Sequence, residues 1–212
     1  MKIALINESS QAAKNALICD TLTSVVEPMG HEVYNYGMYS ADDEVQLTYV
    51  KVGLLAAILL NSGAADYVVT GCGTGEGAML ACNAFPKVLC GHIVDPSDAY
   101  MFGQINDGNA VAIPYAKGFG WGAELNLKYM FEQLFGHQPG GGYPAERAIP
   151  EQANKKILDS VKEITHNDMI SILKNLDQTF VKETLSGPKF REYFFANCKC
   201  PQIKAAVEEI LG

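Results

Sequence analysis

A short apolar run that ends in a loop with glycine at every second position constrains the fold of this chain more than any other feature. The run Tyr67–Thr70 leads into this loop, and an Ala-, Met- and Leu-rich helical pattern starts at Ala78. Strand, tight loop and helix form a βα unit, because glycine lets the backbone turn sharply and approach a ligand closely. The helix start directs free N–H groups and a partial positive charge toward such a ligand. The loop glycines are Gly71, Gly73, Gly75 and Gly77.

Three reactive side chains alternate with these glycines: the thiol of Cys72, the hydroxyl of Thr74 and the carboxylate of Glu76. A thiol beside backbone donors indicates a site that takes a proton and stabilises the resulting oxyanion. A tight turn with an unreactive buried cysteine is the simpler interpretation. The loop also matches a relaxed dinucleotide-binding fingerprint, although that fingerprint normally follows the first strand. A non-catalytic nucleotide- or cofactor-binding protein with a Rossmann-like fold is therefore the alternative to an enzyme.

Apolar runs alternate with helical patterns over the first two thirds of the chain. Repeated βα units predict a parallel sheet covered by helices on both faces, an α/β fold. The expected strands are Ile3–Ile6, Glu32–Tyr36, Tyr67–Thr70, Val88–Gly91 and Ala110–Ile113. The expected helices are Gln11–Met29, Asp42–Asn61, Ala78–Ala84, Ser97–Ile105 and Gly122–Phe135.

The composition changes after Gly136, where a linker rich in glycine and proline begins. Helical patterns then cover Gln152–Thr165, Asn167–Thr184 and Gln202–Leu211. We expect an α/β domain over residues 1–142 and a C-terminal helical extension over residues 143–212. The extension should pack on this domain or on a partner subunit.

Bulk properties exclude several classes of protein. The 212 residues are 48% hydrophobic and 19% charged, which is typical of a globular protein and not of a disordered chain. A net charge of −8 argues against a general nucleic-acid surface. No apolar run approaches the ~20 residues of a membrane span, and the first residues read as a strand and not as a signal peptide. Six scattered cysteines fit reduced thiols, so we expect a cytoplasmic protein.

The glycine loop resembles the signature of the family of ribose-5-phosphate isomerase B and galactose-6-phosphate isomerase. The shared pattern is Cys72-Gly73-Thr74-Gly75-x-Gly77, followed by Ala81-Cys82-Asn83. Tyr49 stands where the family has a pocket tyrosine, and Gln104–Asn109 resembles its Gln-His-Asn-Asp-x-Asn segment. The resemblance covers about residues 1–145.

This resemblance implies a Rossmann-like three-layer α/β/α sandwich with about five parallel strands. It also implies a homodimer or higher oligomer with shared active sites, and aldose–ketose isomerisation of a small sugar without a metal ion or other cofactor. Cys72 would move a proton between neighbouring carbons through a cis-enediolate. Thr74 and the backbone N–H groups of the loop would support the oxyanion, and Asn106 would help hold the sugar.

Several positions depart from the family pattern. Glu8 and Ser9 replace an Asp-His pair after the first strand, and Ile105 replaces the histidine that helps open a cyclic sugar. The chain has only two arginines, of which Arg147 alone stands near the position of the family's phosphate clamp. These departures favour an open-chain keto sugar acid, such as a 4-deoxy-5-keto-uronate, over a cyclic sugar phosphate. Arg147 would hold its carboxylate.

His92 follows the fourth expected strand, where open α/β sheets bind ligands. It is a candidate for the missing acid or base, or else a hydrogen-bonded structural histidine. Glu76 is either a second acid–base group or simply a carboxylate in the first turn of a helix, a position that favours negative charge. We expect Trp121 to anchor a turn to the core. The expected site combines the catalytic residues Cys72 and Thr74 with the binding residues Glu8, Ser9, Tyr49, Gly71, Gly73, Gly75, Glu76, Gly77, His92, Asn106 and Arg147.

Overall fold

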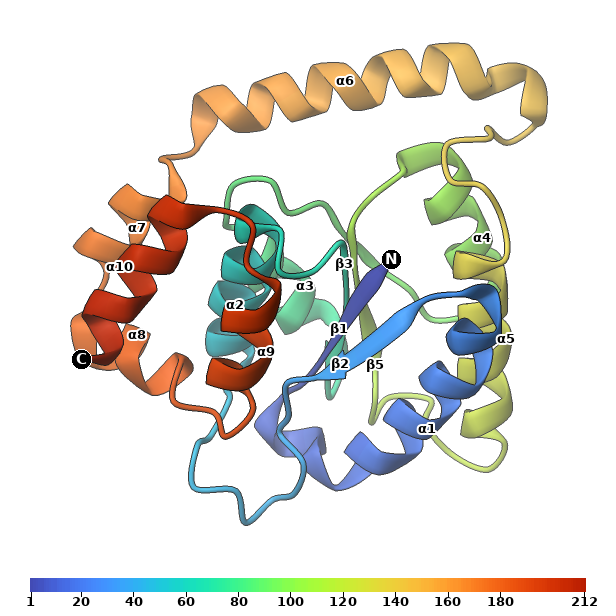
Figure 1. Cartoon of the computed structure of the whole chain (residues 1–212). Coiled ribbons are helices and arrows are strands. Elements are labelled where there is room, and N and C mark those ends of the chain that lie inside the picture. The colour runs from blue at the N-terminus through green and yellow to red at the C-terminus, as the bar shows by residue number, and fades with distance from the viewer.

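In a computed structural model that describes residues 1–212, five parallel strands form one sheet with helices on both faces (Figure 1). The strand order is β2-β1-β3-β5-β4. The long central strands are buried on both faces, which explains their nearly continuous apolar sequences. The predicted fold class is confirmed. The strands are β1 (Lys2–Asn7), β2 (Glu32–Asn35), β3 (Tyr67–Cys72), β4 (Cys90–His92) and β5 (Ala110–Pro114).

Each face of the sheet has its own apolar core. On one face, side chains such as Leu5 and Val69 pack against Ile18 and Phe131. On the other, Ile6 and Val68 belong to a larger cluster that reaches into the C-terminal helices. The first face carries the 3-10 turn η2 (Glu27–Met29) with α1 (Asn15–Val26), α4 (Pro96–Met101), the π-helical turn η3 (Phe102–Asn106) and α5 (Ala123–Phe135). The second carries α2 (Tyr49–Ser62) and α3 (Glu76–Asn83). The 3-10 turn η1 (Ser9–Lys14) leads into α1, and its Ala12 packs in the larger cluster of the second face.

The C-terminal helices are not uniform in how they pack. Four of them extend the α2 side of the core, where the rings of Phe190 and Phe194 stack at 4.9 Å and Tyr36 packs nearby. The proposed boundary at residue 142 stays a prediction, because this core is continuous across it. The helices are α6 (Ala148–Thr165), after the short turn η4 (Ala145–Arg147), then α7 (Met169–Asn175), α8 (Gln178–Thr184), α9 (Phe190–Asn197) and α10 (Pro201–Leu211).

Helix α6 lies across the amino-terminal edge of the sheet (Figure 1). Its polar side faces inward, where Lys155, Asp159 and Lys162 line a cavity. The ammonium of Lys162 is buried and donates hydrogen bonds to the carbonyl oxygens of Asn83 and Val88. The opposite side of α6 exposes an apolar stripe, a pattern that normally faces a core. The α6 stripe comprises Ile149, Ile157, Leu158, Val161 and Ile164.

Some predicted elements differ from the structure. The helix expected over Asp42–Asn61 begins only at Tyr49, because the Thr48 hydroxyl caps it. The helix expected over Asn167–Thr184 is broken, since Asp177 caps a second helix, α8. Trp121 is fully exposed and does not anchor a turn to the core, so that expectation was wrong. No helix is both long and apolar enough to span a bilayer.

Candidate active site

The carboxyl ends of all five strands lie at one edge of the sheet, because every pair is parallel. The strand order reverses between β1 and β3, which is where open α/β sheets form a ligand-binding crevice. Glu8 directly follows β1, Cys72 ends β3, and His92 ends β4. Three of the predicted site residues therefore lie at the same edge because parallel strands carry them there.

Two of the loop glycines are required by the packing. A Cβ on Gly71 would lie 2.1 Å from the carbonyl oxygen of Ile113, so β3 and β5 can approach only without a side chain. Gly75 has a φ of +78° and lies against the ring of His92, 2.7 Å from the position of an added Cβ. Both glycines shape the loop that follows β3.

The loop presents unpaired backbone donors. The carbonyl oxygen of Gly73 accepts from the N–H groups of Ala116 (3.0 Å) and Lys117 (2.9 Å), which fixes the loop beside the end of β5. The N–H groups of Gly73, Thr74 and Gly75 donate no backbone hydrogen bond. They are thus free to bind an oxyanion, just before the positive end of α3.

The thiol of Cys72 and the ring of Tyr49 both lie beside Gly77. The Sγ atom of Cys72 lies 3.7 Å from the position of a Cβ on Gly77, and the ring of Tyr49 lies 3.4 Å from the same position. The thiol is buried, whereas the Tyr49 ring is half exposed. A small substrate bound beside Gly77 would contact a nucleophilic sulfur and an aromatic ring.

His92 holds the glycine loop from the neighbouring strand end. Its Nε2 atom lies 2.8 Å from the carbonyl oxygen of Thr74. Because a carbonyl only accepts, Nε2 carries the hydrogen and Nδ1 is the free nitrogen of the neutral ring. The Thr74 hydroxyl and the Glu76 carboxylate are exposed, and the hydroxyl accepts a long 3.4 Å bond from the N–H of Glu76.

The turn after β1 carries a buried carboxylate. Glu8 accepts hydrogen bonds from the Ser9 hydroxyl (3.0 Å), the Ser10 hydroxyl (2.5 Å) and the Ser10 N–H (3.1 Å). All three donors are neutral. Below this turn the amide of Asn15 donates to Asn7 (3.3 Å) and Asn35 (3.1 Å), which ties the turn to the sheet.

Sequence reasoning missed Gln11 and Lys14, which border the same loop. The Gln11 amide nitrogen lies 3.9 Å from the position of a Cβ on Gly73. The Lys14 ammonium donates to Gln11 Oε1 (2.8 Å) and to the Tyr115 carbonyl oxygen. The same ammonium lies 4.6 Å from the ring centre of Phe119. Burial lowers the pKa of Lys14. In the sequence, both residues read as ordinary positions of a helix start.

Asn106 and Arg147 lie elsewhere in the same chain. Asn106 is exposed at the end of η3, just before β5 begins, and Arg147 precedes α6. The N–H of Gly142 donates to the Gln104 carbonyl oxygen, which keeps the two segments close together. Both residues therefore belong to the amino-terminal edge of the sheet, opposite Cys72.

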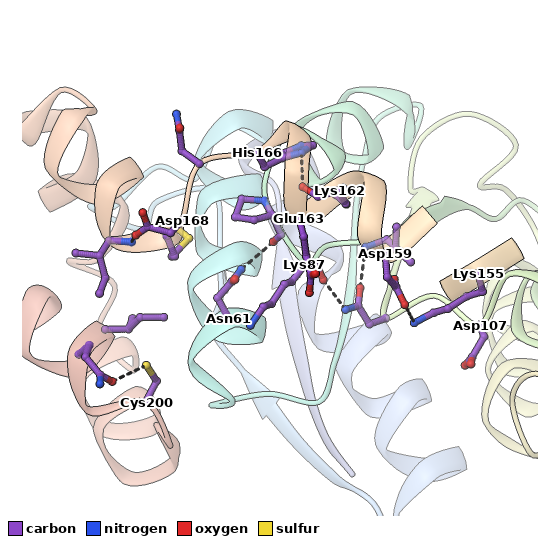
Figure 2. A pocket seen from close by; sticks show the side chains of 18 residues that line it. Asn61, Lys87, Asp107, Lys155, Asp159, Lys162, Glu163, His166, Asp168 and Cys200 are labelled. Carbon is purple, nitrogen blue, oxygen red and sulfur yellow. Dashed lines mark hydrogen bonds and ion pairs between the residues drawn. The ribbon is translucent and has the colours of Figure 1, made fainter. Parts of the chain in front are cut away.

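A cavity of about 620 Å³ is also at this amino-terminal edge. It lies beneath the inner side of α6 (Figure 2). Figure 2 shows its mixed charges, among them Lys155, which is 2.7 Å from Asp159, and the buried Lys162. Burial also raises the pKa of Asp107 on its wall. Within one chain this cavity is separate from the site around Cys72.

Comparisons with known proteins agree with this architecture. A family profile described as Ribose/Galactose Isomerase matches residues 3–133, and one described as Ribose-5-phosphate isomerase matches residues 164–210. No curated protein sequence matches the chain.

Three solved structures illustrate the likeness. A 4-deoxy-L-threo-5-hexosulose-uronate ketol-isomerase complexed with a tartrate is 61% identical, covers 100% of this chain and 99% of its own, and has a TM-score of 0.98. A ribose-5-phosphate isomerase from Vibrio parahaemolyticus is 50% identical with the same coverages and a TM-score of 0.97. A ribose 5-phosphate isomerase from Thermotoga maritima, at 21% identity, shares the fold over 71% of this chain and 96% of its own, with a TM-score of 0.54.

The profile spans most of the α/β part, and two relatives align over the entire chain. The resemblance found in the sequence is confirmed, and so is the prediction of an enzyme. The chain belongs to the ribose/galactose isomerase family and is an aldose–ketose isomerase.

Proposed function

We propose that the protein isomerises an open-chain keto sugar acid of the 4-deoxy-5-keto-uronate type. The observation that carries the proposal is the full-length likeness, at 61% identity, to a ketol-isomerase of this substrate class. Ile105 supplies no acid for ring opening, which an open-chain substrate does not need. Sugar phosphates are the alternative, since the relative at 50% identity is a ribose-5-phosphate isomerase.

The chemistry proposed for Cys72 is a proton transfer between adjacent carbons. The thiolate takes the proton from the carbon beside the carbonyl, and the electron pair moves onto the carbonyl oxygen to form a cis-enediolate. The free N–H groups of Gly73, Thr74 and Gly75, with the Thr74 hydroxyl, stabilise the oxyanion. The hydroxyl proton on the second carbon passes to the oxygen of the former carbonyl. The thiol then returns its proton to the neighbouring carbon, and the second oxygen becomes the new carbonyl.

In our proposal, the other residues of this edge bind and position the substrate. Tyr49 contacts it beside Cys72. Glu8 accepts hydrogen bonds from substrate hydroxyls, and Ser9 donates to them. His92 holds the carbonyl of Thr74 and so orients the neighbouring N–H groups. Glu76 places a carboxylate in the first turn of α3, where the helix dipole favours it.

We infer that a second copy of the chain completes the site. Asn106 and Arg147 lie at the amino-terminal edge, whereas the Cys72 of their own chain lies at the carboxyl edge, so in this proposal they serve the Cys72 of another chain. The exposed α6 stripe and Leu80 on α3, which is 66% exposed, supply apolar surface for such a homodimer.

Turnover of two substrates tests the proposal. We expect kcat/KM at pH 7 for a linear 4-deoxy-5-keto-uronate to exceed that for ribose 5-phosphate by at least ~10²-fold. Deuterium from labelled water should enter the product at the carbon that gains the proton. Comparable efficiency on ribose 5-phosphate would contradict the sugar-acid assignment. Tight ligand binding with no turnover of any sugar would instead support a binding protein.

A further inference from the structure

We propose that Lys14 binds the substrate carboxylate, as a cation supplied by the same chain as Cys72. The inference rests on the sugar-acid substrate proposed above and replaces Arg147 as the partner of that carboxylate. It follows from an ammonium that is held beside the glycine loop without any anionic partner.

The charge of Lys14 has no anionic partner. Its ammonium has two hydrogen-bond acceptors, the side-chain oxygen of Gln11 and the carbonyl oxygen of Tyr115, and both are neutral. Lys14 takes part in none of the ion pairs of the protein. An ammonium has three N–H donors, so one makes no hydrogen bond, and the other neighbour of the charge is the neutral ring of Phe119. A half-buried cation without a counter-ion is costly, and an anionic ligand removes part of that cost.

The ammonium of Lys14 is connected through Tyr115 and Gln11 to the segment that carries the reacting thiol. The same Tyr115 whose carbonyl accepts from Lys14 donates its N–H to the carbonyl oxygen of Cys72 at 2.9 Å. Gln11, which also holds the ammonium, approaches Gly73 from the same side. In a hexosulose-uronate the aldehyde and the carboxylate are at opposite ends of a six-carbon chain. A substrate whose first carbons lie at Cys72 can therefore extend over Gly73 and place its carboxylate near Lys14.

The other cations at this edge are paired or exposed. The ammonium of Lys51 is neutralised by Glu183 at 2.7 Å, and Lys117 is exposed. Glu8 is in the same turn as Lys14, yet its carboxylate accepts hydrogen bonds from Ser9 and Ser10 and forms no ion pair with Lys14. Lys14 is thus a partly buried cation at this edge that has no anionic partner in the protein and could pair with an anionic ligand.

Binding of tartrate, measured by calorimetry on the full-length protein, tests the inference without relying on turnover. We expect Lys14→Gln to weaken tartrate binding about 10-fold or more, the usual value of a charged hydrogen bond. Lys14→Arg should keep most of the affinity, because it keeps the charge. The matched control Lys174→Gln removes a charge from an exposed position of α7 and should leave the affinity unchanged. Threitol, the neutral analogue of tartrate, should bind the wild type and Lys14→Gln equally.

Kinetics separate the two proposals. In Lys14→Gln we expect KM for the keto-uronate to rise about 10-fold while kcat changes little, because the lost contact is distant from the reacting carbons. Unchanged tartrate affinity in Lys14→Gln, or failure of the wild type to bind tartrate, overturns the role of Lys14. Loss of affinity in Arg147→Gln but not in Lys14→Gln returns the carboxylate to Arg147. A wild type that turns over ribose 5-phosphate as well as the keto-uronate refutes the proposed substrate, whatever Lys14 does.

Discussion

His92 donates a hydrogen bond from Nε2 to the carbonyl oxygen of Thr74 across 2.8 Å, and so connects the end of β4 to the loop that follows β3. The ring also packs on Gly75, where a side chain would collide with it. The carbonyl of Thr74 and the N–H of Gly75 belong to one trans peptide and point in opposite directions, so this hydrogen bond orients the Gly75 N–H away from His92. His92 acts as a positioning residue in this arrangement.

Replacing His92 should loosen the loop and lower kcat. We expect His92→Phe, which fills similar space without a donor, to reduce kcat about 10-fold or more, since a small misplacement of oxyanion donors is costly. His92→Gln keeps an N–H donor and should recover part of that loss. Steady-state kinetics of both variants decide the matter. Equal kcat in His92→Phe and the wild type would exclude the positioning role.

Removal of the Cys72 thiol should abolish proton transfer but not binding. We expect Cys72→Ala to lower kcat by ~10²–10⁴-fold, the usual contribution of a general acid–base group. Tartrate affinity should change little, because the thiol faces the reacting carbons. Cys198→Ala, at a half-buried cysteine of the C-terminal region, is the control and should retain activity. Wild-type rates of deuterium exchange in Cys72→Ala would remove this residue from the mechanism.

Charges on the α6 stripe should separate the subunits. Ile157→Glu combined with Ile164→Glu places two carboxylates on side chains that are 62% and 83% exposed in the single chain. The isolated chain should tolerate them, whereas an apolar interface should not. Analytical ultracentrifugation is expected to show a dimer for the wild type and a monomer for the double variant. A wild-type monomer with full activity would contradict the shared site.

Mixing two inactive variants tests whether the site is shared. Cys72→Ala and Asn106→Ala each damage a different edge of the sheet. In a mixed dimer one of the two sites contains an intact Cys72 and an intact Asn106 from different chains. Subunit exchange should therefore restore part of the activity. No recovery, with dimer exchange verified by labelled chains, would place both residues in the same site of one chain or exclude Asn106 from it.

Tartrate binding should also depend on pH through Lys14. Burial lowers the pKa of this lysine, so the ammonium loses its proton at a lower pH than an ordinary lysine, whose pKa is about 10.4. Only the charged form binds a carboxylate, and affinity should fall as the pH rises through the lowered pKa. Lys14→Arg should keep its affinity over this alkaline range because arginine stays charged. Calorimetry at several alkaline pH values measures the difference.

Gly71 should be irreplaceable for stability. An alanine there would meet the Ile113 carbonyl oxygen at 2.1 Å and the Tyr115 ring at 2.5 Å. Such overpacking between β3 and β5 should lower the free energy of unfolding by about 1–3 kcal/mol. Gly120→Ala is the matched control, since nothing lies within 4 Å of the added Cβ there. Urea unfolding of both variants gives the comparison, and equal losses would refute the packing argument.

Local patterns in the sequence were enough to predict the parallel sheet and one edge of the site. Glycines and apolar runs act within a few residues, and a parallel sheet places the carboxyl ends of its strands at one edge. Glu8, Cys72 and His92 could therefore be assigned to a common edge before any coordinates. The family resemblance added the chemistry of the thiol.

Tertiary structure alone decided the rest, because it depends on contacts between distant residues. The environment of Lys14 is made by Tyr115, 101 positions further along the chain, and by the ring of Phe119. Helix α6 turns its polar side toward the protein and its apolar side outward. An amphipathic sequence pattern cannot predict this, because it shows that a helix has two different sides but not which one faces the protein. The separation of Asn106 and Arg147 from Cys72 likewise follows from the strand order and the path of the linker. Local residue preferences determine neither the strand order nor the path of the linker.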